Sequence, residues 1–257
     1  MGVLLSARRS ALPVLASVAA VLGATRPPRP APPPPLLTRA RQLVVVTTPG
    51  WDTTAGVLRR YERADPAGPW RPVGAAVPVV VGRAGLAWDA ELDVADAPAP
   101  RKREGDGRSP AGVFPLDAAF GFAPRDSARW VRLPYVALGP GTECVDDSAS
   151  AHYNTVVDRG AVPRVDWASA ERMRLVAGYR VGVVVGYNAR PVRPARGSCI
   201  FLHVWEGPAR GTAGCTAMDA DALTAVVRWL DPARRPALVQ LPAAAYGRVR
   251  RGWKLPA

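Results

Sequence analysis

Lysine is almost absent from this chain of 257 residues, in which Lys102 and Lys254 are the only two. The formal net charge of +13 therefore comes from arginines, and these are scattered among Ala, Pro and Gly. No helix-turn-helix, zinc-finger or aromatic-basic RNA motif accompanies them, so the charge does not predict a nucleic-acid partner. A solvated basic surface is the simplest interpretation. An anionic envelope polymer or membrane surface is the partner that long-range electrostatics would favour.

Cysteine and histidine are also scarce, with three and two residues respectively. No Cys-x-x-Cys occurs and the spacings match no common zinc finger, so we predict no metal site and no cofactor. Three cysteines fit an oxidising compartment with one pair and one free thiol, and three independent reduced thiols are the open alternative. In the first case Cys144 and Cys199 form the disulfide and Cys215 stays free.

No apolar run is long enough for the ~20 residues that a membrane-spanning helix needs. The longest one near the N-terminus, residues 11–24, follows Arg8-Arg9 and suits the apolar region of a signal peptide. We therefore expect residues 1–24 to be a signal peptide or an uncleaved N-terminal anchor, and residues 25–41 to be a Pro-rich linker. Residues 42–257 are then one folded domain that is exported to the periplasm, cell envelope or exterior.

The hydrophobic pattern of this domain predicts a mainly β fold, a sandwich or barrel with one or two short helices. One helix is clear, at about 220–230, because Asp219 is a good N-cap and Asp231-Pro232 ends the apolar stripe. A second short helix is expected at 168–176. The expected strands are short and alternate with Gly-rich and Pro-rich segments: 43–48, 56–63, 77–81, 86–88, 113–116, 180–187, 198–205 and 237–241.

One of these strands carries the most informative feature of the chain. On residues 198–205 alternate side chains share a face, so His203 lies on the same side as Cys199 and Phe201. A loop at 206–214 with four Gly or Pro residues then turns the chain back to Cys215. The spacing predicts that a strand-held imidazole meets a loop-borne thiol.

These residue types suit nucleophilic catalysis. A free thiol is only about 3% thiolate at pH 7, so a catalytic cysteine needs a base that accepts its proton. His203 could do so and could later protonate a leaving amine, while amides around Gly214 and Cys215 form an oxyanion hole. Asn188, Thr212 and the backbone are candidates for the group that orients the imidazole. In the alternative interpretation His203 is structural and Cys215 is a small hydrophobic residue.

Two segments of the chain resemble a known family, the L,D-transpeptidase (YkuD-type) catalytic domain. Ile200 to Trp205 with Thr212-Ala213-Gly214-Cys215-Thr216 is similar to its signature, in which a strand histidine precedes a Ser/Thr-x-Gly-Cys segment. Ser109-Pro110-Ala111-Gly112-Val113-Phe114 is similar to its Thr-Pro-x-Gly-x-Phe element. The resemblance extends from about residue 43 to 241, with Thr-Ala-Gly-Cys in place of the more frequent Ser-His-Gly-Cys.

The resemblance implies a mostly β enzyme that transfers acyl groups between peptidoglycan stem peptides, with Cys215 as nucleophile and His203 as acid and base. Hydrolysis of the same thioester, by a carboxypeptidase or endopeptidase, and a non-catalytic wall-binding module remain the alternatives. Many members have His at the position of Ala213 and Arg at that of Ala217, so the group that binds the substrate carboxylate is open. Candidate substrate-binding residues are Thr212, Asn188, Tyr187 and Arg210, and the nearby arginines Arg190, Arg193 and Arg196 are further candidates for that carboxylate.

Overall fold

The computed structural model describes residues 1–2, 32–89 and 99–257 of the chain. The expected signal peptide or anchor, residues 1–24, lies outside the described residues apart from its first two positions. The expected linker at 25–41 is described only from residue 32 onward. The helices in the described residues are all too short or too polar to cross a bilayer.

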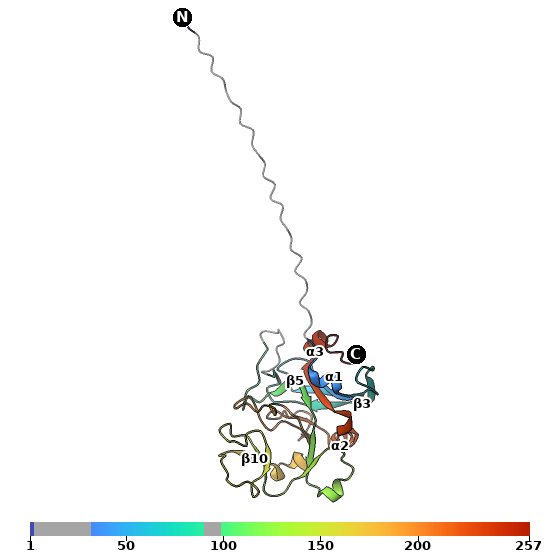
Figure 1. The fold of residues 1–257 in the computed structure, drawn as a ribbon, viewed down its shortest axis with the longest axis vertical. Helices are drawn as coiled ribbons and strands as arrows, with labels where there is room; N and C mark the ends of the chain where they lie inside the picture. Colours follow the sequence, from blue (N-terminus) through green and yellow to red (C-terminus); the bar gives the residue numbers. More distant parts are fainter. Residues whose placement is uncertain (3–31, 90–98) are drawn as a thin grey trace.

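The fold is mainly β, as the sequence predicts, and it is built on one large mixed sheet (Figure 1). The strand order is β4-β5-β14-β1-β2-β3-β13-β12-β11-β6-β7. No pairing between the described residues joins the edge strands β4 and β7 into a closed barrel. The strands of this sheet are β1 Gln42–Thr48, β2 Ala55–Glu62, β3 Arg71–Val80, β4 Leu86–Trp88, β5 Ser109–Pro115, β6 Ala118–Gly121, β7 Tyr135–Ala137, β11 Val181–Val184, β12 Phe201–Val204, β13 Thr216–Met218 and β14 Ala237–Pro242.

The centre of the main core lies around β1 and β14, which pair in parallel. In β1 the run Leu43-Val44-Val45-Val46 is buried on both faces, and β14 is buried along its whole length. A continuous apolar run of β-branched residues is typical of such a doubly covered strand. Ile200, Leu202 and Val204 of the segment around β12 join this core, so the opposite face of β12 is free to form a site.

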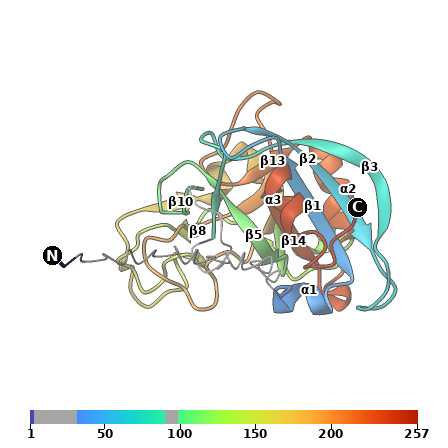
Figure 2. The same cartoon turned by 90° about the horizontal axis from the view of Figure 1, so that it is seen from above.

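A second sheet of three strands contains β10 (Ala170–Arg172), β8 (Thr142–Val145) and β9 (Val156–Asp158), in that order. Figure 1 shows β10 at the opposite end of the domain from α1 and α3, and Figure 2 shows β8 and β10 beside the large sheet. Its residues pack on a smaller core that includes Cys144, Met173, Tyr179, Cys199, Phe201 and Cys215. The three-stranded sheet therefore supports the face of β12 that the main core leaves free.

Three α-helices occur in the described residues, one more than the upper limit that the sequence predicts: α1 Pro35–Arg39, α2 Ala220–Trp229 and α3 Ala243–Val249. The helix α2 agrees with the sequence, because the Asp219 carboxylate accepts hydrogen bonds from the amides of Asp221 and Ala222. The expected linker is wrong at its end, since α1 is helical and buries Leu37 in the core.

The expected helix at 168–176 is also wrong. Residues 170–172 form β10, which pairs with β8, and residues 173–175 form a single 3-10 turn called η2. Pairing with a neighbouring strand decides the structure of this segment. The expected strand at 198–205 is shortened to β12 because Cys199 has a φ of 56°, which lies outside the extended region.

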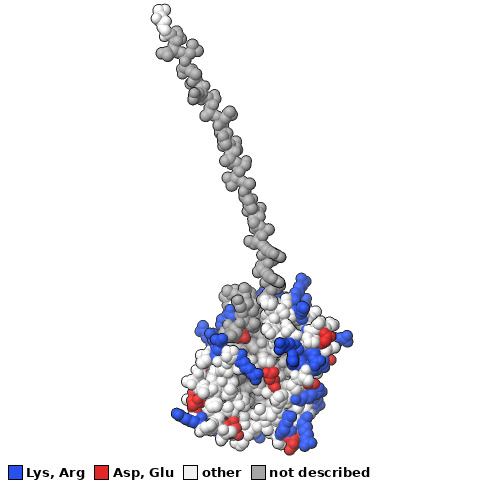
Figure 3. All heavy atoms as spheres, in the orientation of Figure 1, with Lys and Arg blue, Asp and Glu red and all other residues white. Residues whose placement is uncertain are grey.

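The basic side chains are spread over the surface. Figure 3 shows Lys and Arg at many separate places on the drawn face, with acidic side chains between them. Several arginines in the described residues form ion pairs, for example Arg108 with Asp52 at 2.7 Å and Arg234 with Glu62 at 3.2 Å. On the face drawn in Figure 3, this distribution fits a solvated basic surface better than a continuous binding stripe.

Candidate active site

Cys215 and His203 line one cavity of about 310 Å³. Its walls come from β12, β13, the loop between them and the segment that connects β10 to β11. The lining residues are Glu171, Val176, Tyr179, His203, Trp205, Glu206, Arg210, Gly211, Thr212, Ala213, Cys215 and Ala217. Several polar and ionisable side chains therefore converge on a partly apolar cavity, as in many small-molecule and peptide sites.

The parallel pairing of β12 with β13 brings the two residues together. Leu202 is the register partner of Thr216, and His203 is the partner of Ala217. Cys215 directly precedes β13, so by alternation its side chain shares a face with Ala217 and hence with His203. The structure thus places the imidazole of His203 and the thiol of Cys215 on the wall of the same cavity.

Two hydroxyl groups fix the backbone at Cys215. Thr212 Oγ1 donates to the Cys215 carbonyl oxygen at 2.6 Å, and Ser109 Oγ donates to the same oxygen at 2.8 Å. Thr212 Oγ1 also accepts from the Gly214 amide at 3.1 Å, and Ser109 Oγ accepts from the Gly82 amide at 2.8 Å. The Gly214 amide, expected as an oxyanion donor, is therefore engaged by Thr212 before any substrate binds.

The Cys215 thiol is buried in the smaller core. Its Sγ accepts a hydrogen bond from the Phe201 amide at 3.3 Å and donates to the Cys199 carbonyl oxygen at 3.4 Å. Burial raises the pKa of this thiol strongly and the charge of Glu171 raises it further, whereas hydrogen bonds from the Phe201 amide and the Tyr179 hydroxyl act in the opposite direction. Cys215 is therefore a neutral thiol in the resting protein.

His203 is half-buried and is oriented by the backbone. Its Nδ1 lies 2.9 Å from the Val204 carbonyl oxygen, and its ring packs edge-on against Tyr179 with 5.2 Å between centroids. A carbonyl oxygen can only accept, so Nδ1 carries the proton and Nε2 is left as the basic nitrogen. Burial lowers the pKa of His203, which keeps the imidazole neutral. Of the three orienting groups considered from the sequence, the backbone fills the role.

A glycine permits the close contact between His203 and the segment that carries Tyr179. A Cβ at Gly178 would lie 2.5 Å from the Val204 carbonyl oxygen and 3.1 Å from His203 Nδ1. The 3-10 turn η3 (Ala177–Arg180) can therefore approach β12 only with glycine at this position. This approach places the Tyr179 hydroxyl between the thiol and the Glu171 carboxylate, with Oη 2.7 Å from Glu171 Oε2.

The candidate substrate-binding residues divide into two pairs. Thr212 and Arg210 line the cavity, where Arg210 forms an exposed ion pair with Glu206 at 2.8 Å. Tyr187 and Asn188 do not line it, so the structure does not bring them together with Cys215, and their assignment to substrate binding stays a prediction. They hold the loop at 188–197 instead: the Tyr187 hydroxyl donates to the Arg196 carbonyl oxygen, and Asn188 Nδ2 donates to those of Arg193 and Gly197.

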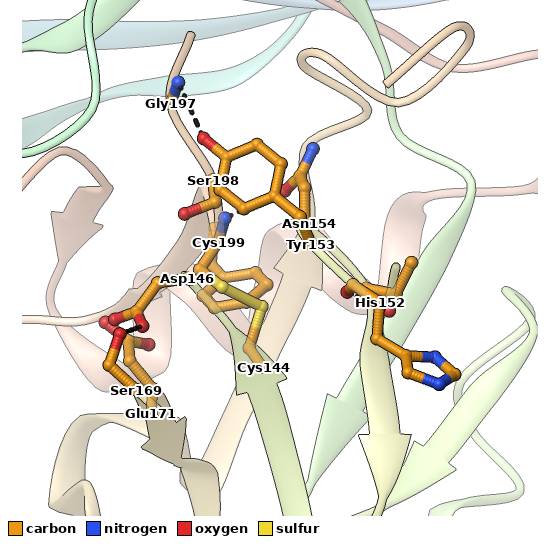
Figure 4. The surroundings of a disulfide bond; sticks show 12 residues. Cys144, Asp146, His152, Tyr153, Asn154, Ser169, Glu171, Gly197, Ser198 and Cys199 are labelled. Atoms are coloured by element: carbon orange, nitrogen blue, oxygen red, sulfur yellow. Dashed lines mark hydrogen bonds between the residues drawn. A yellow bond between two sulfur atoms is a disulfide. The ribbon is translucent and has the colours of Figure 1, made fainter. Parts of the chain in front are cut away.

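Cys144 and Cys199 are joined by a disulfide in the structure, while Cys215 is free. Figure 4 shows the bond between β8 and the segment that precedes β12. Cys199 is further held through its amide, which donates to Asn154 Oδ1 at 2.9 Å. The imidazole of the second histidine, His152, points away from the disulfide in Figure 4 and packs on Trp167, so it takes no part in this site.

Sequence reasoning missed three residues of the site: Ser109, Tyr179 and Glu171. Ser109 stands in the Ser-Pro-x-Gly-x-Phe element, so that motif was the available signal for a role beside Cys215. Tyr179 and Glu171 stand in no motif, and only the tertiary structure brings them to the cavity. Ala213 and Ala217, where many members of the resembled family carry His and Arg, do line it.

No group of three or more His, Cys, Asp or Glu side chains in the described residues is arranged to hold a metal ion. Comparison with known proteins found no match for this chain among family models, curated proteins or solved structures.

Proposed function

We propose that this protein is an exported cysteine acyltransferase with an L,D-transpeptidase-like fold that acts on peptidoglycan stem peptides. One observation carries the proposal: Cys215 and a His203 oriented through Nδ1 line the same cavity from adjacent parallel strands. The mainly β fold with a large mixed sheet agrees with it. The position of Ser109 also agrees with it. Ser109 begins the second segment that resembles the family, and its hydroxyl donates directly to the Cys215 carbonyl oxygen.

The proposed reaction has two steps. The Cys215 sulfur attacks the carbonyl before the terminal amino acid of a stem peptide, and His203 Nε2 takes the thiol proton. The C–N bond breaks, His203 protonates the leaving amine, and a thioester remains on Cys215. An amine of a second stem peptide then attacks this thioester, the C–S bond breaks, and the thiol is restored.

The neutral resting thiol is consistent with this scheme. Because burial raises the pKa of Cys215 and lowers that of His203, the pair rests as thiol and imidazole rather than as an ion pair. Proton transfer must then accompany attack on a bound carbonyl, which limits reaction of the thiol with other electrophiles. The oxyanion requires an amide donor, and Gly214 can supply it if its hydrogen bond to Thr212 is exchanged for one to substrate.

The test is incubation of the protein with a stem tetrapeptide, followed by mass spectrometry of protein and products. We expect a covalent adduct on Cys215 and a cross-linked dimer peptide, and Cys215→Ala should form neither. Tripeptide without dimer would assign the hydrolase instead. Intact tetrapeptide, together with a Cys215 that no acylating carbapenem labels, would leave a non-catalytic wall-binding module.

Location and surface partners belong to the same proposal. The Arg8-Arg9 pair and the apolar run at 11–24 support export, and a Cys144–Cys199 disulfide suits an oxidising compartment. The net charge of +13 favours contact with anionic envelope polymers through long-range electrostatics. Fractionation of cells that produce the full chain would test export. Thiol counting in the isolated protein would test the disulfide.

A further inference from the structure

Glu171 places a carboxylate on the wall of the catalytic cavity. It lies on β10, where it is the register partner of Cys144 on β8. Since the disulfide joins Cys144 to Cys199, and the Cys199 carbonyl oxygen accepts from the Cys215 thiol, Glu171 is tied to the site through a short covalent and hydrogen-bonded path. Its Oε2 accepts from the Tyr179 hydroxyl, which holds the carboxylate in place.

The charges in this cavity do not cancel. Arg210 and Glu206 neutralise each other through an ion pair of 2.8 Å, and His203 is neutral at rest. Within the described residues, no basic side chain forms an ion pair with Glu171, whose polar contact is the Tyr179 hydroxyl. Burial raises the pKa of Glu171, the hydrogen bond from Tyr179 lowers it, and the charges of Asp146 and Glu104 raise it again. A cation beside Glu171 would stabilise its ionised carboxylate, and an anion would destabilise it.

The other side chains that line the cavity provide no competing site for an anion. Ala217 lies on the same face as His203 and is fully buried, and Ala213 lines the cavity as well. A substrate carboxylate would find no unpaired cation among the lining residues, because Arg210 is paired with Glu206. The cavity thus fits a group that carries a positive charge when it approaches Cys215.

We propose that Glu171 binds the ammonium group of the acyl acceptor and takes its first proton, with the Tyr179 hydroxyl as the positioning group for the carboxylate. This inference rests on the proposed acyl transfer and names the acceptor class, a primary amine. The ammonium gives one proton to Glu171, and the neutral amine attacks the thioester carbon. The second proton leaves the nitrogen for His203 Nε2, the C–S bond breaks, and His203 returns that proton to the Cys215 thiolate. Glu171 releases the first proton to solvent when the product leaves.

The Tyr179 hydroxyl completes this subsite from the other side. It donates its single proton to Glu171 at rest, so it stabilises a Cys215 thiolate only when that proton turns toward the sulfur. Its ring packs edge-on against Phe120, Phe201 and His203, so the hydroxyl is held rigidly. Tyr179→Phe keeps these ring contacts and removes only the hydroxyl, which makes it a clean variant.

The experiment separates formation of the acyl-enzyme from its resolution. Full-length protein is acylated on Cys215 with a stem tetrapeptide or with p-nitrophenyl acetate, and the adduct is followed by intact mass. The adduct is then resolved with an amine-bearing stem peptide or with hydroxylamine, a nucleophile that is mostly uncharged at pH 7. The variants are Glu171→Gln and Tyr179→Phe. Asp146→Asn is the matched control, because it removes a neighbouring negative charge from outside the cavity.

In Glu171→Gln we expect resolution by the peptide amine to fall by roughly tenfold or more relative to resolution by hydroxylamine, the effect of one charged hydrogen bond. Tyr179→Phe should shift this ratio in the same direction by a smaller factor, and Asp146→Asn should leave it within about twofold of wild type. An equal loss with both nucleophiles, or an unchanged ratio, would overturn the acceptor role of Glu171.

The two proposals fail in different ways. If p-nitrophenyl acetate acylates Cys215 and the stem peptide does not, the proposed peptide substrate is wrong, while the amine-to-hydroxylamine ratio still tests Glu171. If both reagents acylate Cys215 and the ratio does not depend on Glu171, acyl transfer stands and the inference is wrong. A Cys215 that accepts no acyl group from either reagent overturns both.

Discussion

The carbonyl oxygen of Cys215 offers a quantitative test of how the backbone at this residue is held. It accepts from Thr212 Oγ1 at 2.6 Å and from Ser109 Oγ at 2.8 Å. Thr212→Val removes two hydrogen bonds of the loop and leaves the carbonyl with one donor, so we expect a loss of about 1–2 kcal/mol of stability. Ser109→Ala should cost about 2–3 kcal/mol, because it also leaves the buried Gly82 amide without its acceptor.

The double variant is the informative one. With both hydroxyls removed, the Cys215 carbonyl oxygen has lost both side-chain donors, and a buried acceptor without a partner costs about 1–3 kcal/mol. The loss in the double variant should therefore exceed the sum of the single losses by about 1 kcal/mol or more. The coupling energy is the loss in the double variant minus the sum of the two single losses. The cost of the unpaired Gly82 amide occurs in both variants that contain Ser109→Ala, so it cancels from this difference.

Urea unfolding, fitted with one m-value for all variants, measures the free energy of unfolding of the wild type, the two single variants and the double variant. Ser109→Ala combined with Thr224→Val is the control, since Thr224 Oγ1 donates to Ala220 within α2 and shares no partner with Ser109. That pair should be additive within about 0.5 kcal/mol. Equal additivity for Ser109 and Thr212 would refute the claim that the two hydroxyls jointly fix the backbone at Cys215.

Three further predictions concern the surroundings of the site. Gly178→Ala should cost about 1–3 kcal/mol of stability and impair acylation, because the neighbouring backbone must move away from the new Cβ. Gly247→Ala, with open space around its Cβ, should stabilise the protein slightly. Equal effects of the two substitutions in urea unfolding would contradict this. Burial lowers the pKa of His203, so the unfolded chain takes up its proton first and stability should fall as the pH drops below about 6.5. His203→Gln should flatten that part of the stability-against-pH curve, and an unchanged slope would exclude His203 as its source. Replacing Cys144 and Cys199 by Ser opens a loop of 55 residues and should cost about 4 kcal/mol; a reductant should destabilise wild type alike, and no change would show that the disulfide is absent.

The parts of the fold that the sequence predicts well are those in which local pattern and tertiary environment agree. The apolar run of β1 predicts a strand that is covered on both faces, and in the structure Leu43, Val44, Val45 and Val46 are all buried in the main core. The helix α2 has its own cap and an apolar stripe that packs on the core, so it can be identified without its neighbours. In these elements short-range and long-range preferences coincide.

The errors occur where pairing with distant residues decides the structure. Residues 170–172 lie within the segment expected to be helical, yet they extend to pair with β8. The strand β13 is only three residues long and has no alternation to reveal it, although it directly follows Cys215. At α1 the Pro-rich composition concealed a short helix, since proline is tolerated in the first helical turn.

The candidate site follows the same rule. His203 and Cys215 were predicted because a single strand and loop connect them, so their approach is a local property of the chain. Tyr187 and Asn188 are close to His203 in sequence, but a buried hydroxyl and an amide that hold their own loop keep them out of the cavity. Glu171 and Tyr179 reach it only through the second sheet and a glycine that permits close approach.

The position of Glu171 also bears on the proposed thioester step. Its charge raises the pKa of the Cys215 thiol, and a thiolate of high pKa is a poor leaving group when an amine attacks the thioester. An ammonium bound at Glu171 cancels that charge, and proton transfer to the carboxylate has the same effect. The thiolate then leaves more readily only when the acceptor is present, whereas water brings no positive charge to the subsite. The carboxylate would thus favour acyl transfer to an amine over hydrolysis, the distinction that the motif around Cys215 leaves open.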